Sequence, residues 1–158
     1  MSGQMLDQLL PRSIDNHDRG QKLALVIFAL LVLLKTVISV NSILHGAMVA
    51  GSADGIPLYT FGPAGARTVL NLFALLGLAH LVTCLWCVLV LVRYRAIVPL
   101  MFVLFLLEML GGRLIHHFLA VPRTGNPPGS IVTLVLWGMT IVGLALSLWR
   151  RRSPQPPA

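Results

Sequence analysis

Four long apolar runs constrain the fold of this chain more than any other feature. Each has the roughly 20 residues that a helix needs to cross a hydrocarbon core of about 30 Å. Helices are expected because backbone amides in lipid must find their hydrogen bonds within the segment. The sequence predicts transmembrane helices over about 23–45, 67–92, 96–119 and 130–149.

The composition supports the same fold class. Hydrophobic residues make up 56% of the 158 and charged residues only 11%, against about 25% charged in soluble domains. A membrane barrel would need short alternating strands instead of continuous apolar runs. We therefore expect an all-α, polytopic membrane protein with four transmembrane helices in an antiparallel bundle. Residues 1–22 are a cytoplasmic N-terminal lead, 23–149 the transmembrane domain, and 150–158 a basic, then Pro-rich, cytoplasmic tail.

The basic residues predict which way the helices run. The net charge is +7, and most of the Lys and Arg residues lie at the ends of the runs. If the helices alternate, eight basic residues fall on one side (Arg12, Arg19, Lys22, Arg93, Arg95, Arg150, Arg151 and Arg152). Three fall on the other (Arg67, Arg113 and Arg123). Cytoplasmic loops carry the excess of Lys and Arg, which places both termini in the cytoplasm.

This distribution also bears on localisation and partners. The compact chain and its charge bias favour the inner (plasma) membrane of a bacterium. Basic residues at helix ends are explained by topology and by anionic lipid headgroups, so nucleic-acid binding is not expected. The expected partners are the lipid bilayer and other membrane proteins, including further copies of the chain.

Each predicted helix has one seam of small and weakly polar residues. Such residues let membrane helices approach closely, because lipid supplies no hydrophobic drive between helices. We interpret the seams as packing surfaces. They contain Ala24, Phe28, Leu31, Lys35, Ser39, Ser42 and Gly46; Phe73, Gly77, His80, Cys84 and Cys87; Glu108 and Gly112; and Thr133, Thr140, Gly143 and Ser147.

Three ionisable residues lie near the middle of the first three runs: Lys35, His80 and Glu108. Each is 12 residues from the predicted cytoplasmic boundary of its helix, or about 18 Å deep. The other acids lie outside the runs, so Glu108 is the one acid inside the membrane. A charge at this depth is costly unless it is paired. We therefore predict a Lys35–Glu108 contact, with His80 nearby.

This intramembrane polar site has three interpretations. The first is a structural staple that fixes the register of the helices. The second is a proton- or ligand-handling site, since intramembrane Glu and His residues recur in proton relays and binding cavities. In the third, the long stem of Lys35 carries its charge toward the interface without making a contact.

A second basic cluster is predicted on the outer side of the membrane. It comprises Arg67, Arg113, His116, His117 and Arg123. This rim is poor in acids, so it suits a small anion or an anionic headgroup. The simpler interpretation is that these side chains anchor the helix ends in the interface.

The cysteines and histidines allow cofactor hypotheses that the sequence supports weakly. Cys84 and Cys87 form a C-x-x-C pair, but they lie within an apolar helix near its cytoplasmic end, where thiols are inert and kept reduced. With His80 they line one helix face without a visible fourth metal ligand. His45 with His116 or His117 is a conceivable haem pair. We expect no metal and no cofactor.

The functional prediction follows from what the runs contain. Glu108 is the sole Glu of the chain, which excludes paired-carboxylate chemistry inside the bundle, and no nucleophile–base pattern or phosphate loop is visible. We expect no enzyme. The leading hypothesis is a small inner-membrane protein with a structural, accessory or partner-binding role. The alternatives are a proton or small-solute carrier that uses Lys35, His80 and Glu108, and a membrane redox carrier based on haem or thiols.

Overall fold

The computed structural model describes residues 22–119 and 128–149, and this part of the chain is helical without any strand. The four long helices are α2 (Lys22–Leu44), α4 (Pro63–Arg93), α5 (Val98–Phe118) and α6 (Gly129–Leu148). A single turn of 3-10 helix, η3 (Arg95–Ile97), precedes α5. All four helices are long and apolar enough to span a membrane, α5 together with η3.

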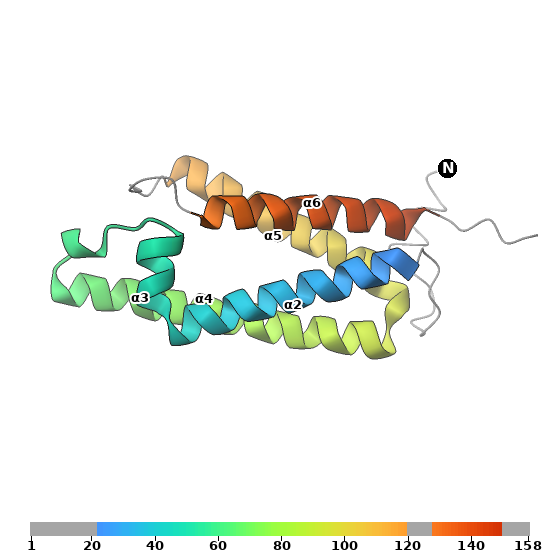
Figure 1. Ribbon diagram of the computed structural model, residues 1–158, viewed down its shortest axis with the longest axis horizontal. Helices are drawn as coiled ribbons and strands as arrows, with labels where there is room; N and C mark the ends of the chain where they lie inside the picture. The colour runs from blue at the N-terminus through green and yellow to red at the C-terminus, as the bar shows by residue number, and fades with distance from the viewer. Residues whose placement is uncertain (1–21, 120–127, 150–158) are drawn as a thin grey trace, which may run out of the picture.

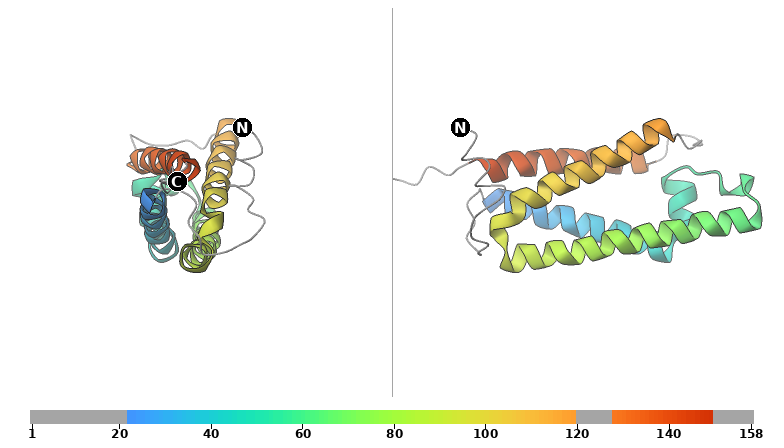
Figure 2. Two further views of the ribbon diagram at one scale, coloured as in Figure 1. Left: turned by 90° about the vertical axis from the view of Figure 1, so that its right-hand side faces the viewer. Right: turned by 180° about the vertical axis from the view of Figure 1, so that it is seen from behind.

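The chain reverses direction between consecutive long helices (Figure 1). The start of α2, the passage from α4 to α5 and the finish of α6 lie at one end of the molecule, which we call the junction end. The opposite end, with the finish of α2 and the start of α4, is called the far end. α2 packs along α4 and also contacts α6, whereas α4 and α5 diverge from the junction end (Figure 2).

Local sequence signals explain two helix boundaries. α4 begins at Pro63, four residues before the expected start at 67, because proline fits the first turn of a helix, where its missing N–H is not needed. Pro99 occupies the first turn of α5 in the same way. With 31 residues, α4 is about 46 Å long and is the longest helix in the described part of the chain.

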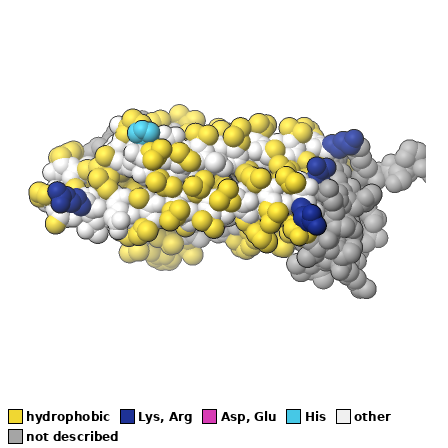
Figure 3. Space-filling view, turned by 90° about the horizontal axis from the view of Figure 1, so that it is seen from below, with side chains coloured by type: hydrophobic (Ala, Val, Ile, Leu, Met, Phe, Trp, Pro, Cys, Tyr) yellow, Lys and Arg dark blue, Asp and Glu magenta, His cyan; other side chains and the backbone are white. Residues whose placement is uncertain are grey.

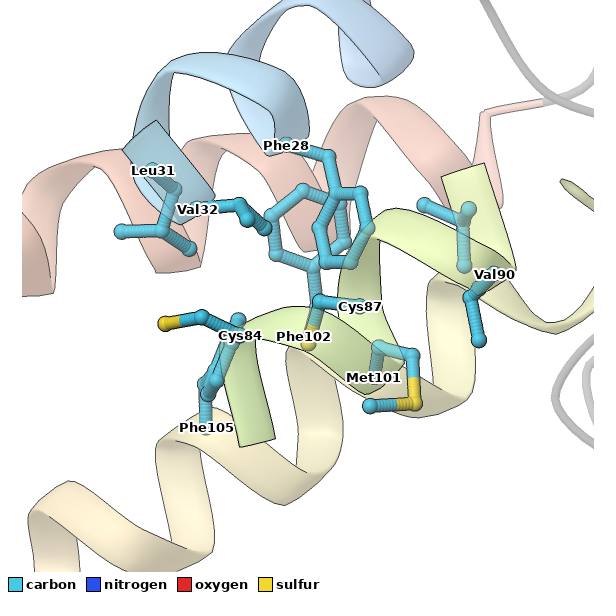
Figure 4. Packing of buried hydrophobic residues seen from close by; sticks show 10 residues of the cluster. Phe28, Leu31, Val32, Cys84, Cys87, Val90, Met101, Phe102 and Phe105 are labelled. Carbon is cyan, nitrogen blue, oxygen red and sulfur yellow. The ribbon is translucent and has the colours of Figure 1, made fainter. Parts of the chain in front are cut away.

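The hydrophobic core lies where α2, α4 and α5 meet in the half of the molecule toward the junction end. Phe28 of α2 packs edge to face against Phe102 of α5, with ring centroids 5.3 Å apart (Figure 4). Phe105, Cys84 and Cys87 pack into the same cluster. The aromatic rings thus hold α2 to α5 near the start of α5, just before Glu108.

Small residues permit the close helix crossings. A Cβ atom added to Gly77 of α4 would lie 2.9 Å from the carbonyl oxygen of Ser39 on α2. One added to Gly143 of α6 would collide with the ring of Phe102. Gly77, Ser39 and Gly143 belong to the predicted seams and are buried, whereas Thr133 of the last seam is exposed. The seams therefore coincide largely with the packing surfaces.

The segment from Gly46 to Gly62 contains short helices. These are α3 (Gly46–Met48), η1 (Val49–Ala53, a π-helical turn) and η2 (Leu58–Thr60, a 3-10 turn). The chain bends at Asp54, and Gly55 has a positive φ of 70°. The small residues of this segment, among them Gly46, Ala50 and Ala53, pack closely enough for it to form these short helices.

The same segment folds against the start of α6 at the far end. A Cβ atom on Gly129 would lie 2.6 Å from the carbonyl oxygen of Ala53 and 3.0 Å from Oδ1 of Asp54. Asp54 is therefore placed beside the N-terminus of α6, where the helix dipole favours a negative charge. This contact joins residues that are 75 positions apart in the chain, counting from 54 to 129.

The surface has the pattern of a membrane protein. Figure 3 shows hydrophobic side chains along the length of one face, with Lys and Arg side chains only near its two ends. Many large apolar side chains are exposed in the middle of the helices, including Leu85, Val82 and Leu107. Such an extensive apolar surface suits lipid rather than water.

Candidate functional site

Lys35, His80 and Glu108 meet in the structure at a single carboxylate oxygen. Nζ of Lys35 lies 2.7 Å from Oε1 of Glu108 and donates a hydrogen bond to it. Nε2 of His80 lies 3.0 Å from the same oxygen. The predicted contact between Lys35 and Glu108 is thus confirmed, and His80 joins it directly.

The equal depth of the three residues follows from helix geometry. Each lies 13 residues from the junction-end limit of its apolar span, at Lys22, Arg93 and Arg95 respectively. At 1.5 Å per residue this is about 20 Å along each helix. Since α2, α4 and α5 all have an end at the junction end, these counts bring the three side chains to one level.

Phe105 is a further member of the site that sequence analysis did not identify. Nζ of Lys35 lies 4.6 Å from the centroid of the Phe105 ring, which makes a cation–π contact. Phe105 precedes Glu108 by three residues on α5, so both face the same side of the helix. That spacing was the signal available in the sequence. Together, the ring and the carboxylate fix the ammonium group from two sides.

Burial differs sharply within the site. The side chain of Lys35 is only 11% exposed, so its charge stays in the interior and does not extend toward the interface. The side chains of Glu108 and His80 are 35% and 33% exposed. The Glu108 and His80 side chains are therefore partly accessible at the surface of the protein, whereas the Lys35 side chain is not.

The surface side of the site offers an unused hydrogen-bond acceptor. Oε1 of Glu108 receives both donors, whereas Oε2 accepts no hydrogen bond from the residues that the structure describes. Within that part of the chain no buried side-chain nitrogen or oxygen lacks a partner. The buried polar groups are thus satisfied, and Oε2 belongs to a side chain that is 35% exposed.

The two cysteines belong to the core rather than to a reactive site. Cys84 and Cys87 are free thiols, both buried among Phe28, Phe102 and other apolar residues. They lie on the same side of α4 as His80. The described residues contain no group of three His, Cys, Asp or Glu side chains placed to hold a metal ion.

The basic residues predicted for the outer rim are not gathered by any contact. Arg67 is exposed on α4, and Arg113, His116 and His117 are exposed on α5. No ion pair or hydrogen bond joins them within residues 22–119, and their helices diverge toward the far end (Figure 2). Arg123 lies outside the described residues. An anion or headgroup site at this rim remains a prediction.

Comparisons with known proteins do not extend this picture. No protein-family model, curated protein or solved structure matches the chain.

Proposed function

We propose that the four helices form an antiparallel bundle across a bacterial inner membrane, with the junction end in the cytoplasm. The support is the charge distribution: Lys22, Arg93 and Arg95 lie at the junction end, and the sequence before Lys22 and after Trp149 carries further basic residues. The far end carries fewer basic residues. By the positive-inside bias, the junction end is cytoplasmic.

Within this membrane, we propose that the protein acts without catalysis, by binding a partner protein inside the bilayer. The observation that carries the proposal is the one-third exposure of the Glu108 and His80 side chains at mid-membrane depth. The ion pair with Lys35 has a structural part, because it joins α2 to α5. A purely structural ion pair is expected to lie wholly inside the bundle, whereas the Glu108 side chain is 35% exposed.

The energetics favour a covered site. Polar groups in hydrocarbon cost several kcal/mol when nothing satisfies them, and intramembrane charges usually face protein or water. Here Glu108 is flanked along α5 by the exposed apolar residues Leu104 and Leu107. A partner helix that covers Glu108 and His80 shields these side chains from lipid. The free-energy cost of exposing them to hydrocarbon is then removed, which favours binding.

A photo-crosslinking experiment tests the partner hypothesis in intact membranes. A photoreactive amino acid replaces Leu104, which is one helical turn before Glu108 and 46% exposed. The matched control is Val82, which is 58% exposed and about 200° around α4 from His80. A protein adduct at position 104 and lipid adducts alone at position 82 support the proposal. Lipid adducts alone at both positions contradict it.

A proton or small-solute carrier is the second candidate. The convergence of Lys35 and His80 on one oxygen favours it, because protonation of Glu108 would remove the negative charge that both groups contact. In proteoliposomes with an internal pH dye, the native chain would then relax an imposed pH gradient faster than the Glu108→Gln variant. Equal rates for the two chains would eliminate this candidate.

A further inference from the structure

We propose that Glu108 and the adjoining face of α5 bind a transmembrane helix of a different protein, and that this helix presents a primary amide (Asn or Gln) at mid-membrane depth. The inference rests on the partner-binding function and names the chemistry of the partner. We define the α5 face as Leu104, Glu108, Gly111 and Ile115, which follow the i, i+4, i+7, i+11 spacing of one helix side.

The hydrogen-bonding state of the site requires a donor. Lys35 directs its ammonium group to Oε1, and His80 donates to the same oxygen from Nε2. When Nε2 of a neutral imidazole carries the proton, Nδ1 is an acceptor. The two remaining positions, Oε2 of Glu108 and Nδ1 of His80, are then both acceptors. A matching group must bring N–H or O–H donors.

The charge of the site selects a neutral donor. The positive charge of Lys35 already balances the negative charge of Glu108 at 2.7 Å. A second cation at Oε2 would face the Lys35 ammonium across one carboxylate, in a medium that screens charges weakly. A hydroxyl or an amide adds donors without that repulsion.

Between these two, helix chemistry favours the amide. The hydroxyls of membrane helices can bond to the carbonyl of their own preceding turn, as those of Thr36, Thr83 and Thr140 do here. A side-chain amide has two N–H donors and so keeps one to cross to another helix.

A second copy of this chain does not meet the requirement. Asn41 is the nearest amide to Lys35 on α2, but it lies six residues, or about 9 Å, farther toward the far end. Its Nδ2 already donates to the carbonyl of Val37. Two copies with the same orientation would therefore present their amides above the Glu108 level.

The shape of the α5 face suits a helix. A Cβ atom added to Gly111 would have no neighbour within 4 Å, and the same holds for the adjoining Gly112. These glycines expose backbone one turn beyond Glu108, so another helix can approach closely there. The predicted interaction combines this close approach with the single polar contact at Glu108.

The test uses the full chain with a fluorescent donor label in phosphatidylcholine vesicles. The probes are two acceptor-labelled synthetic transmembrane peptides, one of Leu residues with a single central Asn and one with Leu throughout, at dilutions where both are monomeric. We expect energy transfer to the Asn peptide at a concentration at least tenfold lower than for the all-Leu peptide. Equal transfer to both peptides would overturn the proposal.

Three variants identify the surface. Gly111→Ile should abolish the preference by blocking close approach, whereas Gly138→Ile on α6, which is equally open, should retain it. The double variant Lys35→Met/Glu108→Met removes the acceptor together with its counter-charge and should also lose the preference. Unchanged binding by Gly111→Ile, or energy transfer between copies of the chain that excludes the peptide, would show the proposal to be wrong.

These outcomes separate the proposal from the function on which it rests. If crosslinking at Leu104 captures a protein but the Asn peptide is not preferred, the face binds a partner of other chemistry. If crosslinking yields lipid alone while the peptide is preferred, the chemistry is right but the partner-binding function fails in the membrane tested.

Discussion

Lys35 and Glu108 are joined through one carboxylate oxygen, because Nζ lies 2.7 Å from Oε1 and the described residues show no hydrogen bond from Lys35 to Oε2. The Lys35 side chain is nearly buried and makes a cation–π contact with the Phe105 ring, whereas the Glu108 side chain is one-third exposed. The two partners of this ion pair therefore differ in burial: the ammonium group lies inside the protein, whereas the glutamate side chain is partly accessible from outside.

The first prediction concerns the strength of this pair. Lys35→Met and Glu108→Met should each lower the free energy of unfolding, by at most about 3 kcal/mol, because each leaves one charge of the pair without its partner inside the apolar span; the loss should be smaller for Lys35→Met, since Glu108 is one-third exposed. The double variant should recover most of this loss. The measurement is reversible unfolding in mixed micelles with increasing SDS, followed by circular dichroism. A double variant as unstable as the sum of both single variants would show that the two charges are not coupled.

The second prediction ranks His80 below the ion pair. His80→Phe removes one hydrogen bond to Glu108 and should cost about 1 kcal/mol, since Lys35 still balances the carboxylate. The control is His116→Phe, an exposed site at the far end, which should be neutral in the same assay. If His80→Phe lowers the free energy of unfolding as much as Glu108→Met does, the imidazole stabilises the carboxylate as strongly as Lys35 does, and this ranking is wrong.

The third prediction tests the crossing of α6 over α5. Gly143→Ala places a methyl group against the ring of Phe102, which is fully buried and cannot move aside. Overpacking of this kind costs about 1–3 kcal/mol. Gly138→Ala on the same helix meets open space and should be neutral or slightly stabilising. Equal unfolding midpoints for the two variants would contradict the crossing seen here.

The fourth prediction tests the proposed orientation. In a chain with Cys84 and Cys87 replaced by Ala, a single cysteine at Tyr59, which is 82% exposed, should react with a membrane-impermeant maleimide applied to intact spheroplasts. A cysteine at Arg95, exposed at the junction end, should react only after permeabilisation. The opposite pattern of labelling would place the junction end outside the cell.

Much of the fold could be read from the sequence because membrane helices are encoded by long local signals. The apolar runs gave helix positions within a few residues, except that α4 begins at Pro63. The contact between Lys35 and Glu108 was predictable for a different reason. Glu108 is the sole acid in the runs, so a lysine at equal depth has one counter-charge available.

The remaining features depend on how helices pack, which no local pattern specifies. Glu108 is one-third exposed and α4 and α5 diverge, and both features depend on tertiary packing between residues far apart in the sequence, such as Phe28 and Phe102. The contact of Ala53 with Gly129 likewise joins distant parts of the chain. Sequence analysis could place the three ionisable groups at one depth but could not say which of them reaches the surface.

The length of α4 has a consequence for the kind of bilayer that this protein prefers. Its roughly 46 Å exceed a hydrocarbon layer of about 30 Å, whereas α5 and α6, with 21 and 20 residues, match that layer closely. The excess lies in the first turns of α4, which contain Arg67 and Asn71 and favour water and headgroups. The shorter helices therefore set the preferred bilayer thickness. α4 alone is long enough for a thick bilayer, but in such a bilayer α5 and α6 would be too short and Arg67 of α4 would lie closer to lipid. Hydrophobic mismatch therefore disfavours thick bilayers for this protein.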